Sequence, residues 1–220
     1  KEVAYRQRKC KSQDASRRFL KGPFMRALLV FAAIAFPPLF DMNSYADDTI
    51  TISAVGDIMM GSTYPKKALP PDDGEGIFDG VSGRLKGSDI VFGNLEGPLT
   101  ERRRPSKCKG GENCYEFKTP KSYVRHLKNA GFNVLNIANN HAMDFGEKGA
   151  KDTIKALKSS GIKASGGSEI AVIEIKGRKI AVVGFSFSDS PYSYSINDIE
   201  GAKKLISGLK ASNDIVIVSF

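Results

Sequence analysis

The strongest constraint on the fold is a regular alternation between short apolar segments and amphipathic segments. Apolar segments of the kind that form strands occupy residues 49–55, 89–92, 133–138, 170–175, 179–185 and 215–220. Amphipathic segments of the kind that form helices occupy residues 77–85, 120–130, 146–160 and 199–209. Strands that alternate with helices pack in layers, with the helices against the faces of a sheet. The sequence therefore predicts an α/β domain.

Local signals mark several boundaries of these elements. Gly131 and Gly161 follow two of the expected helices, as glycines at helix ends commonly do. Lys176-Gly177 lies between two strand-like segments and predicts a hairpin. Residues 97–119 are polar and rich in turn residues, which indicates a long loop. The last segment, IVIVSF at 215–220, is continuously apolar and is interpreted as a buried strand.

The first 46 residues have a different character. Met25-Arg26 precedes the apolar run 27–40, and Ser44-Tyr45-Ala46 follows as a small-x-small exit, a pattern typical of a secretory signal peptide. The run is shorter than the ~20 residues that cross a membrane. We expect residues 1–24 to be an upstream extension, residues 25–46 a signal peptide, and residues 47–220 the mature domain. The alternative is an uncleaved membrane anchor at 26–40; in both cases the domain is exported to the periplasm or the cell exterior.

The positive charge of the chain is concentrated in this leader. The formal net charge is +9, and residues 1–46 account for +6 of it with nine Lys/Arg and three Asp/Glu. The remaining 24 Lys/Arg and 21 Asp/Glu nearly balance, so the mature domain lacks the electrostatic footprint of a nucleic-acid binder. A short basic run, Arg102–Arg104 followed by Lys107 and Lys109, is interpreted as a solvated loop rather than a binding patch.

Export also decides how the cysteines are interpreted. Cys108 and Cys114 stand in the mature domain with five residues between them, within the segment CKGGENC. Exported proteins form disulfides, and a pair this close can staple a loop. A metal site is the alternative, but no His or further Cys stands near the pair in sequence.

Polar residues follow three of the expected strands. Asp57 follows the first strand, Asn94 and Glu96 follow the second, and residues 139–144 (NNHAMD) follow the third. In α/β sheets, ligands bind beyond the carboxyl ends of the strands. Oxygen and nitrogen donors of these types suit divalent metals. A purely structural role is the alternative for these clusters, because an Asp after a strand glycine often caps a turn and Asn-Leu-Glu often forms a solvated turn.

Only two histidines occur in the chain, and they are interpreted differently. His141 follows two asparagines and precedes Asp144, and an acid three residues on can orient an imidazole. A structural role is the alternative for a single histidine of this kind. His126 lies between Arg125 and Lys128 on an expected helix and is interpreted as a surface residue.

Four sequence pieces together resemble one family. AVGDIMMG, GNLEGPLT, the element from Phe117 to Pro120 and LKNAGFNVLNIANNHAMDFGEKGAKDTIKAL occur in the order and spacing of the bacterial capsule-synthesis family of CapA type, which concerns poly-γ-glutamate and is known by its PGA_cap domain. That family is similar to calcineurin-like metallophosphatases. The resemblance implies a layered αββα sandwich and two divalent metal ions (Mn, Fe, Zn or Mg).

The resemblance also implies roles for individual residues. Metal-site positions are Asp57, Asn94, Glu96 and Asn140. His141 is then an acid or oxyanion partner, and Asp144 orients it.

The sequence departs from the wider pattern in two places. Met59 stands where the wider superfamily has a histidine ligand. A His-x-Gly-x-Glu-like element and a later histidine motif are expected after the last strand and do not occur before Phe220. We therefore expect a domain that is incomplete at its C-terminus and has little or no catalytic activity in this form.

The implied function is that of a capsule-synthesis protein with a metallophosphoesterase-like site. Its expected partners are the capsule polymer or a capsule-synthesis complex at the cell envelope. Two alternatives remain open, a non-catalytic cell-envelope scaffold and a secreted 5′-nucleotidase-like phosphoesterase.

Overall fold

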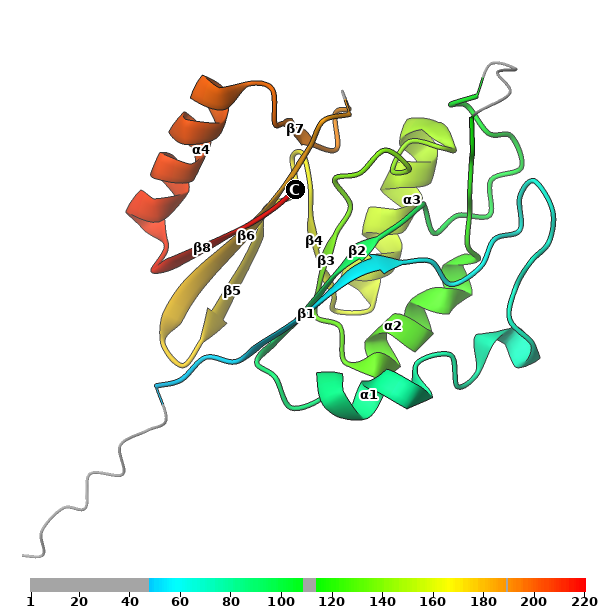
Figure 1. Ribbon diagram of the computed structural model, residues 1–220, viewed down its shortest axis with the longest axis horizontal. Coiled ribbons are helices and arrows are strands. Elements are labelled where there is room, and N and C mark those ends of the chain that lie inside the picture. The colour runs from blue at the N-terminus through cyan, green and yellow to red at the C-terminus, as the bar shows by residue number, and fades with distance from the viewer. Residues whose placement is uncertain (1–47, 109–113, 189) are drawn as a thin grey trace, which may run out of the picture. The chain divides into compact units, whose positions relative to one another are not determined.

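Four parallel strands form the first sheet in their sequence order, β1 (Ile52–Ile58), β2 (Ile90–Leu95), β3 (Val134–Asn136) and β4 (Lys163–Ser165). A computed structural model describes residues 48–108, 114–188 and 190–220, and Figure 1 shows their arrangement. The expected upstream extension and the signal peptide or anchor (residues 1–46) lie outside the described residues. In the part of the chain that is described, no helix is both long and apolar enough to span a membrane.

Three helices connect these strands and cover one face of the sheet (Figure 1). They are α1 (Asp79–Leu85), α2 (Val124–Ala130) and α3 (Gly146–Ser159), with short 3-10 turns at η1 (Asp72–Gly74) and η2 (Lys121–Tyr123). Leu127 of α2 and Leu157 of α3 are fully buried against this face. Gly131 ends α2 with φ 104°, a left-handed conformation that glycine adopts without strain.

The second sheet is formed by β5 (Ala171–Ile175), β6 (Arg178–Ser186), β7 (Tyr194–Ser195) and β8 (Ile215–Ser219). β5 and β6 form the expected antiparallel hairpin, while β7 and β8 run parallel to β6. Helix α4 (Ile199–Ser212) connects β7 to β8 and lies beside β8 (Figure 1). Its half-buried residues Ala202, Leu205, Ile206 and Leu209 recur at helical spacing.

The core divides according to the two faces of the first sheet. In β2, Val91 packs with the helices, whereas its neighbours Ile90 and Phe92 pack against the second sheet. This alternation follows from the two-residue period of a strand. Val182 of β6 supplies the facing surface. Helices, sheet, sheet and helix therefore follow one another, and the expected αββα layering is confirmed.

Several boundaries and exposures differ from the sequence interpretation. β1 continues through Gly56-Asp57 because a register shift between Ala54 and Asp57 lets the pairing with β2 resume, and β2 continues through Asn94. The prediction of a buried last strand was wrong, since β8 is only half-buried and Ile215 is 38% exposed. Strand-like composition reports local backbone preference, whereas burial depends on which elements cover the strand.

His126 is a second correction. The sequence placed it on the surface of its helix because its neighbours are charged. The side chain is in fact buried, with Nε2 2.8 Å from the carbonyl oxygen of Asp73, and Tyr123 packs edge-on against the ring. The loop at 72–74 covers this part of α2, which local charge could not indicate.

The two sheets approach each other closely at Gly184 of β6. A Cβ atom there would overlap the side-chain oxygen of Asn136 on β3 and lie 2.8 Å from the Cβ of Ala138. Gly184→Ala should therefore destabilise the domain by about 1–3 kcal/mol, as overpacking does. Gly208→Ala is the matched control, because nothing lies near that position in the exposed helix α4 and alanine favours a helix by up to about 1 kcal/mol. Urea unfolding measures both; equal stabilities for Gly184→Ala and the wild type would contradict the close approach.

Candidate active site

The polar residues that follow the first three strands lie in one row. The strand pairing sets Asp57 of β1 beside Asn94 of β2, and Asn94 beside Asn136 of β3. Because the three strands are parallel, their carboxyl ends meet at one edge of the sheet. The structure thus brings together the residues that the sequence placed at separate strand ends, and it adds Asn136, which the sequence analysis did not select.

The side chain of Asn94 is the centre of this row. Its Nδ2 donates hydrogen bonds to Asp57 Oδ1 (2.8 Å) and to Glu96 Oε2 (2.9 Å). Its Oδ1 accepts from the side-chain nitrogens of Asn136 and Asn139, both at 3.0 Å. With all four bonds made, the amide orientation is defined. The amide group of Asn94 therefore links the carboxylates of Asp57 and Glu96.

His141 and Asp144 form a buried pair next to this row. His141 Nδ1 lies 2.7 Å from Asp144 Oδ2, and the Asp144 side chain is fully buried. The backbone N–H of Phe117 also donates to Asp144 Oδ2 at 2.7 Å. The other ring nitrogen, Nε2, lies 3.6 Å from Glu96 Oε1. This places His141 between Asp144 and Glu96, so the pair that the sequence proposed adjoins the carboxylate cluster.

The turn that carries His141 is defined by Asn139. Its side-chain oxygen accepts from the backbone N–H of His141 at 3.0 Å. Its side-chain nitrogen donates to the carbonyl oxygen of Leu95 in addition to Asn94. Asn139 is itself buried. The second asparagine, Asn140, is exposed at the rim, so the two neighbours have different roles.

A cavity of about 400 Å³ opens over the row. Asp57, Asn94, Glu96 and Asn140 line one side. The opposite side comes from the second sheet and includes Phe185, Phe187 and Phe220. These aromatic residues were missed by the sequence analysis because only the packing of the two sheets brings them to the site.

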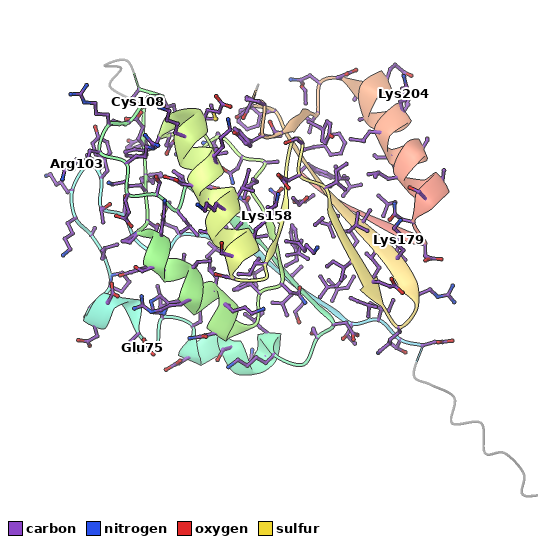
Figure 2. All side chains as sticks on the ribbon, turned by 180° about the vertical axis from the view of Figure 1, so that it is seen from behind. Glu75, Arg103, Cys108, Lys158, Lys179 and Lys204 are labelled. Atoms are coloured by element: carbon purple, nitrogen blue, oxygen red, sulfur yellow. A yellow bond between two sulfur atoms is a disulfide. The ribbon has the colours of Figure 1, made fainter. Side chains whose placement is uncertain are left out.

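Lys107 is a further residue that the sequence analysis missed. Its Nζ lies 3.2 Å from Asp144 Oδ1 and 3.4 Å from His141 Nδ1. The sequence grouped it with a solvated basic run, and no local signal separates it from that run. Arg102–Arg104 of the same run are exposed, as expected for a solvated loop, and Arg103 points outward (Figure 2). Lys109 lies outside the described residues.

Burial changes the acid–base behaviour of Glu96. Desolvation raises the pKa of its carboxyl above the usual value, and the nearby charge of Asp57 adds to this effect. His141 and the hydrogen bond from Asn94 act in the opposite direction but are outweighed. A cation bound beside Glu96 would therefore stabilise its charged form more than it would stabilise the charged form of a surface carboxylate.

The donor types fit one divalent cation better than two. Asp57 and Glu96 supply two carboxylates that accept from the same amide nitrogen, and magnesium or manganese is often held by one or two carboxylates together with water or substrate oxygens. Asn94 directs its nitrogen rather than its oxygen toward these carboxylates. Among residues 48–108, 114–188 and 190–220, no group of three or more His, Cys, Asp and Glu side chains is arranged to hold a metal.

Known proteins resemble the chain over most of the described domain. A family model described as "Bacterial capsule synthesis protein PGA_cap" matches residues 51–220. Capsule biosynthesis protein CapA of Bacillus anthracis is 32% identical over 192 residues, which are 79% of this chain and 46% of that protein. PGA biosynthesis protein CapA of Bacillus subtilis strain 168 is 33% identical over 193 residues, 80% of this chain and 50% of that protein. The chain spans about half the length of these two relatives.

A solved structure shows a weaker likeness. It is that of a putative 5′-nucleotidase from Staphylococcus aureus in complex with alpha-ketoglutarate. The match covers 77% of this chain and 36% of that chain, with a TM-score of 0.43 and 13% sequence identity.

The raised pKa of Glu96 predicts a pH-dependent effect of Glu96→Gln in the presence of a chelator. A carboxyl whose pKa is raised on folding favours the folded state below its unfolded pKa, and this contribution is lost as pH rises through the folded pKa. Glutamine stays neutral, so the variant should gain stability relative to wild type between pH 4 and pH 7. Urea unfolding at the two pH values measures this difference.

Glu147→Gln is the control with the opposite sign. The hydrogen bond to Lys151 lowers the pKa of exposed Glu147, so its contribution is present at pH 7 and lost at low pH. That variant should be equal to or less stable than wild type at pH 7. If the two variants changed in the same direction with pH, the assignment of Glu96 as a desolvated carboxylate would be wrong.

Proposed function

Because the chain belongs to the bacterial capsule synthesis protein PGA_cap family, we propose that the cavity at the strand ends is a metal-dependent hydrolytic site of phosphoesterase type that serves capsule synthesis. One observation carries the proposal: Asp57 and Glu96 converge on the Asn94 amide, and Nε2 of the His141–Asp144 pair lies 3.6 Å from Glu96. Carboxylates next to an oriented imidazole are the groups such a reaction requires.

Asp57 and Glu96 would hold the cation, with Asn140 at the rim of the same cavity. A bound divalent cation supplies polarisation of a substrate oxygen and a lower pKa for water. Asn94 links the two carboxylates, supported by Asn136 and Asn139. A second cation is part of the family expectation and would require ligands beyond this set.

His141 would act on the leaving group. Asp144 accepts a hydrogen bond from Nδ1, which leaves Nε2 directed toward the cavity side at Glu96. From there the imidazole can donate a proton to the leaving oxygen or stabilise its negative charge. The aromatic side chains of the second sheet line the other side of the same cavity.

Export and a partner at the cell envelope belong to the same proposal. The disulfide between Cys108 and Cys114 supports export, since such bonds persist in oxidising compartments. A capsule polymer, or the complex that assembles it, is the proposed partner. For this chain by itself we expect weak cation binding and little turnover, because two carboxylates alone hold a divalent ion poorly against water.

Cation binding tests the proposal directly. Calorimetric titration with Mn²⁺ should show one site that Asp57→Asn removes. Asn139→Ala should weaken binding by about 10–100-fold, because it removes the group that orients Asn94. Glu200→Gln on exposed α4 is the control and should bind as wild type does. Absence of Mn²⁺ binding by the wild-type chain would contradict the proposal and favour a non-catalytic scaffold role at the cell envelope.

Turnover tests the role of His141. We expect hydrolysis of bis(p-nitrophenyl) phosphate with Mn²⁺ to be slow in the wild-type chain, and kcat should fall further, by up to about 10²–10⁴-fold, in His141→Ala, with little change in KM. His126→Ala is a matched control, because that histidine lies in α2 away from the row of donors. Activity of His141→Ala equal to that of the wild type would overturn the catalytic assignment. Preferential hydrolysis of adenosine monophosphate would favour the nucleotidase alternative.

A further inference from the structure

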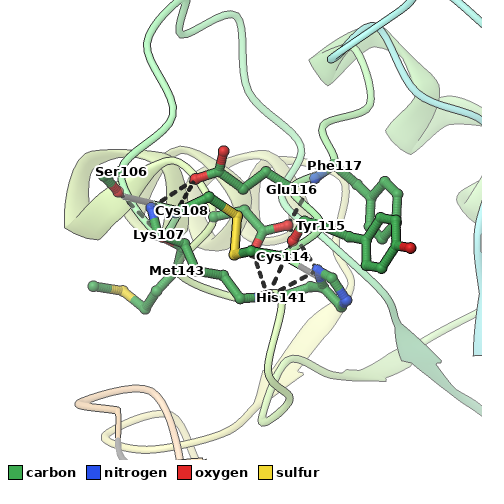
Figure 3. Close-up of a disulfide and its surroundings, with 10 residues drawn as sticks. Ser106, Lys107, Cys108, Cys114, Tyr115, Glu116, Phe117, His141 and Met143 are labelled. Carbon is green, nitrogen blue, oxygen red and sulfur yellow. Dashed lines mark hydrogen bonds and ion pairs between the residues drawn. A yellow bond between two sulfur atoms is a disulfide. The ribbon is translucent and has the colours of Figure 1, made fainter. Parts of the chain in front are cut away.

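The backbone on both sides of Lys107 is bonded to other parts of the structure. The disulfide joins Cys108 to Cys114, with their Cα atoms 5.7 Å apart. The buried carboxylate of Glu116 accepts hydrogen bonds from the backbone N–H groups of Lys107 and Cys108, both at 2.7 Å. On the other side, the N–H of Ser106 donates to the carbonyl oxygen of Asp144 at 2.8 Å. Figure 3 shows these groups around the disulfide.

The side chain of Lys107 reaches from this loop to the His141–Asp144 pair. Its ammonium is bonded to the carbonyl oxygen of Tyr115 at 3.2 Å and lies 3.2 Å from Asp144 Oδ1. Asp144 Oδ2 is already used by His141 and Phe117. Within the described part of the chain, Asp144 Oδ1 has no hydrogen-bond partner, and the Lys107 ammonium is the cation that faces it.

In this arrangement the ammonium of Lys107 compensates the buried carboxylate of Asp144. A buried carboxylate oxygen without a compensating group is strongly disfavoured. If the ammonium were removed, the Asp144 carboxylate would have to rotate or bind a water molecule to compensate its buried oxygen. Either change would alter its hydrogen bond to His141. Lysine has a long flexible side chain whose ordering costs entropy. The hydrogen bonds from the backbone of Lys107 and Cys108 to Glu116, with the disulfide at Cys108, hold the backbone from which this side chain extends.

We propose that Lys107, held by Glu116 and by the neighbouring disulfide of Cys108, is a positioning residue for the His141–Asp144 pair. The significance of the pair for catalysis rests on the proposed function, but the positioning itself does not. It follows that the orientation of His141 depends on the redox state of Cys108 and Cys114. Reduction by dithiothreitol transfers two electrons and two protons to the protein disulfide, yielding two thiols and the cyclic disulfide of the reagent.

The two histidines of the chain allow a direct test by NMR at one fixed pH. In the oxidised protein, the proton on His141 Nδ1 is hydrogen-bonded to Asp144 and largely buried from solvent. The hydrogen bond should give it a downfield signal, and the burial should make its exchange with water slow. Lys107→Met should abolish this signal. Lys107→Arg, which keeps the positive charge, should retain it. The ring signals of buried His126 report folding in the same spectrum and should not move in either variant.

The redox part is tested on the same sample. Dithiothreitol, or the Cys108→Ser/Cys114→Ser double variant, should weaken or remove the His141 signal and leave His126 unchanged. Lys151→Met is the matched control, since it removes an exposed ion pair with Glu147 and should change neither histidine. A His141 signal that survives Lys107→Met, or a change in both histidines with Lys107→Met, overturns the proposal.

The outcome is independent of turnover. A chain that shows the expected His141 changes but hydrolyses no phosphodiester would contradict the proposed function and leave the positioning role intact. A chain that turns over substrate equally well with Lys107→Met, at unchanged kcat and KM, and keeps the His141 signal would overturn the positioning role alone.

Discussion

The four hydrogen bonds of the Asn94 side chain are the interaction on which the rest of the site depends. A primary amide has two hydrogens and an oxygen with two acceptor positions, and here each of these four is used. The hydrogens hold Asp57 and Glu96 on one side, and the oxygen holds Asn136 and Asn139 on the other. A single side chain on the central strand β2 therefore joins β1, β3 and the turn that follows β3.

The turn after β3 then fixes the position of His141. Asn139 accepts from the N–H of His141 while it donates to Asn94, so the ring is placed relative to the carboxylates through two hydrogen bonds. Asp144 orients the ring through Nδ1, the nitrogen other than the one that faces Glu96. Lys107 and Phe117 in turn contact Asp144. The Phe117 ring lies 4.7 Å from the imidazole, centroid to centroid. Polar contacts and an aromatic contact thus restrict the same side chain.

Much of the fold and part of the site could be predicted from local sequence. The alternation of strand and helix patterns, the hairpin at Lys176-Gly177 and the disulfide all depend on nearby residues, and the structure contains each of them. The site residues Asp57, Asn94 and Glu96 could be proposed because parallel strands end at one edge. Lys107 and Phe185 could not, because they stand far from His141 in sequence and carry no pattern that distinguishes them from a solvated lysine or a core phenylalanine.

The sequence by itself determined the four helices, most of the strands and which donors stand at the strand ends, because backbone preference and side-chain periodicity act over a few residues. The short strands β4 and β7 were not predicted, because segments of three and two residues carry too little periodicity. Membership of the capsule-synthesis family also follows from sequence. Tertiary structure alone decided the burial of His126, the partial exposure of β8, the direction of the Asn94 amide and the contact of Lys107 with Asp144. The physical reason is that burial and hydrogen-bond partners are properties of what packs against a residue, and the packing partners here come from elements tens of residues away.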